Sequence, residues 1–215
     1  MLLGTKIIEF EGLGPAPFAG RMLAELGADV LVIKNLNQKE KSLKNSILNA
    51  GKKSVYLDLK DVSDYSIALE LIRNSDALIE GFRPGVMERL NLGPSDLKKE
   101  NGKLIYGRMT GWGQKGPRSK QAGHDLNYIG LNGALHYASR AGDIPQTIPT
   151  VVGDIGGGSL YLIIGILSGL LKAQKTGEGT IVDAAIVDGS AHMMNLLMSM
   201  QDTGSIEMKR GLSLL

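Results

Sequence analysis

The sequence has 215 residues, of which 43% are hydrophobic, and this suits one large globular domain. Its 24 basic and 22 acidic residues leave a formal net charge of +2, which is too small to imply nucleic-acid binding, since that normally needs a concentrated basic face. Any anion site is therefore expected to be local. There is no cysteine, which excludes a disulfide scaffold, catalysis by a thiol and a cysteine-ligated metal, and fits a reducing compartment.

The first half of the chain alternates short apolar strands with amphipathic helices. Strands are predicted at 6–10, 30–33, 54–59, 77–80 and 104–110, and helices at 18–26 and 64–72, with Pro84 and Pro94 at the starts of short helices. This order predicts an α/β domain with a Rossmann-like, mainly parallel sheet flanked by helices. Residues 1–10 lack the features of a signal peptide, so a cytoplasmic protein is expected.

The second half begins with a glycine-rich loop and a helix at 125–135. Asp154 then precedes an apolar helix, followed by a strand at 180–183 and a Met-rich helix that ends near residue 200. The most apolar run, 159–171, is shorter than the roughly 20 residues that cross a bilayer, so a buried helix and no membrane span are expected. The methionines and leucines of 193–200 are interpreted as helix core.

Two glycine patterns suggest a dinucleotide site, and both are incomplete. In the first, Pro17 stands where the third glycine belongs; in the second, Pro117 follows where a helix should open. There is no P-loop pattern, so nucleoside triphosphate chemistry is not expected either. The patterns consist of Gly12 and Gly14, and of Gly111, Gly113 and Gly116.

Two side chains are candidates for acid–base chemistry. His124 follows the glycine-rich loop, where it faces a cleft or, as is more common for a lone histidine, has a structural role. Asp154 fits the N-cap of the helix after it, but Gly156, Gly157 and Gly158 also suit close approach of a ligand to a helix N-terminus. The residues alone leave both alternatives open.

Basic residues form a second set of candidates. Lys34 ends a predicted strand and Arg83 follows one, and open α/β sheets bind ligands beyond the carboxyl ends of their strands. A separate basic stretch is either a solvated face or a site for a phosphorylated ligand, and it contains Lys39, Lys41, Lys44, Lys52 and Lys53.

Five segments, in order along nearly the whole chain, resemble family III CoA-transferases, and in particular their α-methylacyl-CoA racemase branch. The segments begin with Glu80-Gly81-Phe82-Arg83-Pro84-Gly85, Thr110-Gly111-Trp112-Gly113, Gly123-His124-Asp125-Leu126-Asn127-Tyr128, Gly153-Asp154-Ile155-Gly156 and Gly177-Glu178-Gly179-Thr180.

The resemblance implies a CoA thioester substrate and proton transfer at its α-carbon by two bases, His124 and Asp154. CoA is then part of the substrate, and no further cofactor and no metal are implied. The resemblance also places a set of residues in contact with substrate or CoA, namely Lys34, Lys52, Lys53, Arg83, Gly123, Asp125 and Tyr128. Two positions depart from the racemase pattern: Lys34 stands where arginine is usual, and Thr150 where asparagine is usual.

The same resemblance leaves two rival functions. In the transferase branch the aspartate that matches Asp154 is a covalent nucleophile, but a transferase needs no histidine base at His124. The other rival is a non-catalytic acyl-CoA-binding remnant, because the family continues into a smaller second domain and a returning C-terminal segment. Residues 1–215 would then be the large domain alone, from a truncated or split gene, in an interlocked homodimer or with a complementing C-terminal chain.

Overall fold

The computed structural model describes residues 1–41, 47–207 and 209–211, which contain a six-stranded, all-parallel sheet. The strand order is β3-β2-β1-β4-β5-β6, so the order reverses between β1 and β4. This confirms the predicted α/β class. The strands are β1 (Lys6–Phe10), β2 (Asp29–Asn35), β3 (Lys53–Leu57), β4 (Ala77–Glu80), β5 (Ile105–Thr110) and β6 (Thr180–Ala185).

Helices connect the strands and extend the fold after β5 and β6. Pro94 begins α4 as predicted, whereas α3 begins two residues after Pro84. The α-helices are α1 (Pro15–Glu25), α2 (Val62–Arg73), α3 (Val86–Arg89), α4 (Pro94–Glu100), α5 (Asp125–Leu131), α6 (Leu160–Thr176), α7 (Ile186–Met193) and α8 (Asn195–Asp202). The shorter or wider helical segments are η1 (Leu36–Lys41), η2 (Ile47–Asn49), η3 (Ala134–Tyr137) and η4 (Val151–Ser159).

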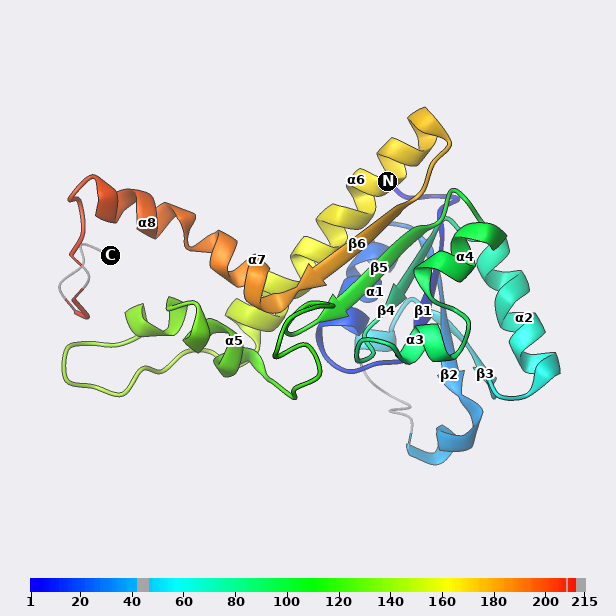
Figure 1. Ribbon diagram of the computed structural model, residues 1–215, viewed down its shortest axis with the longest axis horizontal. Coiled ribbons are helices and arrows are strands. Elements are labelled where there is room, and N and C mark those ends of the chain that lie inside the picture. Colours follow the sequence, from blue (N-terminus) through cyan, green and yellow to red (C-terminus); the bar gives the residue numbers. More distant parts are fainter. Residues whose placement is uncertain (42–46, 208, 212–215) are drawn as a thin grey trace.

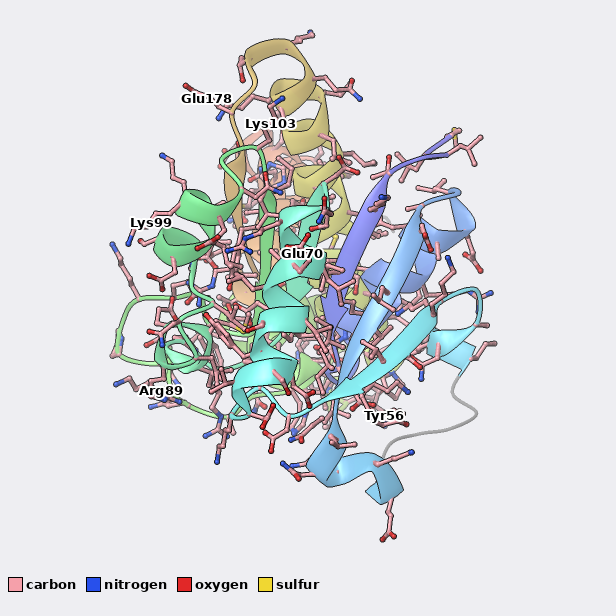
Figure 2. The ribbon with its side chains drawn as sticks, turned by 90° about the vertical axis from the view of Figure 1, so that its right-hand side faces the viewer. Tyr56, Glu70, Arg89, Lys99, Lys103 and Glu178 are labelled. Carbon is pink, nitrogen blue, oxygen red and sulfur yellow. The ribbon has the colours of Figure 1, made fainter. Side chains whose placement is uncertain are left out.

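The sheet is buried on both faces by two separate cores. Neighbouring residues of one strand enter opposite cores, as Ile7 and Ile8 do, because side chains alternate across a strand. One core packs α1 and α6 against the sheet, and the other packs α2, α3 and α4. Figure 1 shows α6 on one side of the strands and α2 and α4 on the other, and Figure 2 looks onto the α2 side, where Glu70 is labelled.

The two ends of the sheet differ in whether they are expected to bind a ligand. Figure 2 shows Tyr56, near the carboxyl end of β3, at one end, and Lys103 and Glu178, which precede β5 and β6, at the opposite end. In parallel sheets ligands bind at the carboxyl end, beside the point where the strand order reverses. That point lies between β1 and β4.

The apolar helix of the second half begins earlier than the sequence suggests. A π-helical segment, η4, runs directly into α6, so Asp154 lies inside the first turn and does not precede the helix as an N-cap. The combined helix Val151–Thr176 has 26 residues, which corrects the expectation that it is too short to cross a bilayer. Length and composition also fit a core helix, and Leu162, Ile163 and Ile166 are buried in the core beside the sheet.

The Met-rich helix is divided into α7 and α8, and most of its apolar side chains are not core. Met194 is buried, but Met193, Leu196 and Met198 are 40%, 69% and 47% exposed. Figure 1 shows α7 and α8 leading away from the sheet. The core interpretation is therefore wrong for this segment, because α8 extends beyond the layers that the sheet organises.

Candidate active site

A cleft of about 730 Å³ lies at the carboxyl ends of β1, β2 and β3. The glycine-rich turn after β1 forms one wall, which explains why Gly12 and Gly14 resemble part of a dinucleotide motif. Phe82, after β4, lines another part. The cleft thus occupies the position where open α/β sheets hold ligands.

Of the predicted basic residues, Lys34 lines this cleft. Its Nζ is 3.7 Å from Glu11 Oε1 and 5.7 Å from the centroid of the Tyr56 ring. Arg83 is exposed on the loop after β4 and directly follows Phe82 in the chain. Lys34 and Arg83 therefore flank the region where the strand order reverses.

Lys52 and Lys53 do not reach the cleft. The side chain of Lys52 is 1% exposed, and its Nζ lies 2.6 Å from Glu9 Oε2 and 2.8 Å from the Pro17 carbonyl oxygen. Burial raises the pKa of Glu9 to about 7 and lowers the pKa of Lys52. Lys53 begins β3 at the opposite end of the sheet, where it pairs with Asp29 at 2.9 Å.

Of the rest of the basic stretch, the structure describes only the side chain of Lys39. Lys39 lies over the ring of Tyr56, 5.3 Å from its centroid. Lys44 and the side chain of Lys41 lie outside the described residues. The sequence analysis missed Asp58 and Lys60, which line the cleft directly after β3. The end of the predicted strand was the signal that could have found them, because residues beyond the carboxyl ends of parallel strands face a ligand.

The second set of candidates gathers around α5 and η4, outside the residues that line the cleft. His124 is the N-cap residue of α5, and its backbone N–H donates to Asn127 Oδ1 at 2.9 Å. Its side chain is exposed. This contact from the Asn127 side chain therefore fixes the backbone of His124, from which the imidazole projects.

Asp154 is half-buried in η4. Burial and, to a lesser extent, the negative charge of Asp125 raise the pKa of its carboxyl to about 6, while His124 acts in the opposite direction. His124 and Asp154, 30 residues apart in the sequence, are thus close enough to interact electrostatically. An aspartate with this pKa exchanges a proton near neutral pH.

Asp125, Tyr128 and Gly123 hold this region together. Asp125 is 4% exposed, and its Oδ1 accepts hydrogen bonds from the backbone N–H groups of Gly153 and Asp154, both at 2.7 Å. Tyr128 is buried edge-on against Trp112, with ring centroids 4.7 Å apart, and burial raises the pKa of its hydroxyl to about 12.

Gly123 is required by this packing, since a Cβ there would lie 2.7 Å from a ring carbon of Tyr128. Within the described ranges no three His, Asp or Glu side chains are grouped as metal ligands.

The glycines after Asp154 make room for α7 and not for a ligand. A Cβ on Gly157 would lie 2.5 Å from the Ser190 backbone nitrogen, and one on Gly189 would overlap the Gly157 carbonyl oxygen. The expected use of Gly156, Gly157 and Gly158 N–H groups at a helix N-terminus is therefore wrong, because these residues lie within a helix that begins at Val151.

The N-cap residue of this helix is Thr150, whose φ of 65° is unusual for a β-branched residue. Asparagine, which is usual here in the racemase pattern, adopts this conformation at lower cost.

The chain is similar to proteins that are already known. The model of CoA-transferase family III matches residues 2–212. The chain belongs to this family. It is 38% identical to α-methylacyl-CoA racemase of Mus musculus over 215 residues, which are 100% of this chain and 55% of that protein. The chain therefore spans about half the length of the curated relatives it matches.

Other family members carry transferase names. Acetyl-CoA:oxalate CoA-transferase of Acetobacter aceti is 33% identical over 97% of this chain and 57% of that protein. A solved structure of a CAIB/BAIF family protein from Brucella suis superposes with a TM-score of 0.86 at 27% identity, covering 97% of this chain and 59% of that one. The family supports an enzyme of acyl-CoA chemistry, and it contains both racemases and transferases.

Proposed function

We propose that this chain is the proton-transferring part of an α-methylacyl-CoA racemase, which interconverts (R)- and (S)-2-methylacyl-CoA thioesters. The observation that carries the proposal is the proximity of His124 to Asp154, through which His124 lowers the pKa of the Asp154 carboxyl against the effect of burial. Its relatives with racemase names support the same assignment.

The chemistry requires two groups on opposite faces of the α-carbon. The α-proton of a thioester is weakly acidic, so a positioned base must remove it while another group returns a proton. The imidazole of His124 can both accept and donate a proton, and partial burial keeps Asp154 protonated more often than an exposed aspartate. One residue is the base and the other the acid, and their roles reverse with the direction of the reaction.

The cleft beside β1 and β2 is the proposed site for the nucleotide end of CoA. Lys34 lines it and Arg83 adjoins it, and a phosphate there would gain charge-assisted hydrogen bonds. Lys60, directly after β3, is a further candidate for this contact. The acyl group would then extend from the cleft towards α5 and η4. A cytoplasmic enzyme that works as an interlocked dimer or with a complementing C-terminal chain belongs to the same proposal.

The test is α-proton exchange in heavy water. With a 2-methylacyl-CoA substrate and the C-terminal part of a relative supplied, the protein is expected to incorporate deuterium at the α-carbon and to invert the centre. His124→Gln and Asp154→Asn should each lower inversion by a factor on the order of 100 or more. Asp61→Asn, which removes a carboxylate from the N-terminus of α2 on the other face of the sheet, is the matched control and should not change the rate.

The rival functions give different results in this experiment. A family III CoA-transferase that uses Asp154 as a nucleophile would move CoA to a free acid without deuterium at the α-carbon, and Asp154→Asn would abolish that transfer while His124→Gln would not. A non-catalytic acyl-CoA-binding remnant would bind the thioester and catalyse neither reaction.

A further inference from the structure

The N-terminus of η4 is capped by a side chain from another helix. The first N–H groups of any helix have no partner within the helix, and the N-cap residue Thr150 makes no side-chain hydrogen bond to them. Asp125, the first residue of α5, accepts from the N–H groups of Gly153 and Asp154 instead. The cap is therefore a long-range contact between two helices.

The fit of this cap depends on glycine. A Cβ on Gly153 would lie 2.7 Å from Asp125 Oδ1, so a larger residue there would displace the carboxylate from the two N–H groups. Asp125 is also buried, with 4% of its surface exposed. A carboxylate so enclosed is poorly placed to contact a CoA thioester.

Asp125 connects the two candidate acid–base groups through the backbone. It directly follows His124, whose own N–H is held by Asn127, and it binds the N–H of Asp154 itself. A change in the position of its carboxylate would therefore move Asp154 relative to His124.

We infer that Asp125 is a positioning residue, whose carboxylate sets the place and the charge environment of Asp154 opposite His124 and does not itself contact substrate. This inference rests on the proposed two-base function only for its catalytic consequence. The cap and its electrostatic effect are properties of the chain without substrate.

The electrostatic effect follows from the unpaired part of the carboxylate. Asp125 Oδ2 is buried and has no hydrogen-bond partner among the described residues, so its negative charge is only partly compensated. Burial is the main reason that the pKa of Asp154 is raised, Asp125 adds to it, and His124 opposes it. The other titratable groups on elements packed against η4 are not among the causes of this raised pKa. They are Arg21 and Glu25 on α1, Tyr128 on α5, Tyr106 and Arg108 on β5, Asp183 on β6, Tyr161, Lys172 and Lys175 on α6, and Asp188 and His192 on α7.

Two substitutions separate the cap from the charge. Asp125→Asn keeps an oxygen that can accept the two hydrogen bonds but removes the charge, whereas Asp125→Ala removes both. Asp61→Asn is the matched control, because Asp61 caps α2 by accepting from the N–H groups of Ser63 and Asp64 in the same way. All three variants are made in the 215-residue chain.

The readouts are amide hydrogen exchange at Gly153 and Asp154, and the ¹³C-carboxyl NMR titration of Asp154. Because a negative neighbour raises the pKa of a carboxyl, Asp125→Asn should shift the Asp154 midpoint to lower pH. Asp125→Ala should also make the two amides exchange at least about tenfold faster, since they lose their acceptor. The Asp61→Asn control should leave both readouts at their wild-type values.

An unchanged Asp154 midpoint in Asp125→Asn, or unchanged amide exchange in a folded Asp125→Ala protein, would overturn the inference. If Asp125→Ala does not fold, the titration of Asp125→Asn decides alone. Neither readout needs substrate, so a failure of racemisation in heavy water would refute the proposed function and leave this result intact.

Discussion

Adjacent residues of the same type can have opposite roles, and Lys52 and Lys53 show this. Lys52 is buried with Glu9 between β1 and the first turn of α1, whereas Lys53 holds Asp29 at the surface. A buried charge is tolerated only when it is paired, while an exposed pair gains little because water screens it. The two residues are therefore expected to differ sharply in their effect on stability.

Lys52→Met should lower the free energy of unfolding by about 3–5 kcal/mol, because it leaves the Glu9 carboxylate buried without its partner. Lys53→Met, the matched control, should change it by no more than about 1 kcal/mol. Urea denaturation of both variants measures the difference. A double variant, Glu9→Gln with Lys52→Met, should recover part of the loss, and equal stability of the two single variants would contradict the argument.

The types of residue that form the candidate site could be predicted from the sequence. Where a type occurs many times, as lysine does, the sequence could not show which of its residues lie in the site. His124 and Asp154 stand out because each has an unusual local setting, and the structure places them together. The lysines carry no such distinction, so their separation into buried, cleft-lining and surface positions follows only from the tertiary fold. Asp125 was expected to contact substrate, and no sequence pattern reveals that its carboxylate binds a backbone 28 residues away.

At the scale of elements, the strands were predictable and the η4 segment was not. Buried parallel strands are short, mainly apolar runs between polar turns, and the predicted limits of the strand at 77–80 agree with the structure. The segment 151–159 has five apolar or small residues in a row around its glycines, which define no helical or strand period. In the structure α7 packs closely against it at Gly157 and Gly189, a contact between distant parts of the chain.

Gly189→Ala should destabilise the protein by about 1–3 kcal/mol or more, because its Cβ would overlap the Gly157 carbonyl oxygen on a facing backbone that cannot rotate away. Gly130→Ala in α5 is the control: the nearest atom to its Cβ would be Leu135 Cδ2, at 3.8 Å, so the substitution should be neutral or stabilise by up to about 1 kcal/mol. Thermal unfolding of the two variants tests this. A Gly189→Ala protein as stable as Gly130→Ala would mean that α7 does not pack on η4 at this distance.

At the scale of the whole molecule, the core is enclosed around the sheet, whereas α8, at one end of the molecule, has its apolar side chains exposed to solvent. The α8 helix contains no buried residue, and Figure 1 shows it at the end of the molecule opposite α2. The outer face of α6 also carries exposed Leu160, Ile164 and Leu171. Contiguous apolar surface in water favours association.

An eight-residue helix is only marginally stable alone in water, so α8 is expected to be stabilised when its apolar side chains are covered. We therefore predict that the 215-residue chain self-associates as its concentration rises, which sedimentation velocity over a range of loading concentrations would detect. Leu196→Lys with Met198→Lys should shift the species towards monomer, because each lysine places a charge where apolar surface would be buried. Ile67→Lys, at a position 48% exposed on α2, is the control and should leave the association unchanged. A wild-type chain that sediments as a monomer at every concentration would show that α8 is stable without a covering partner.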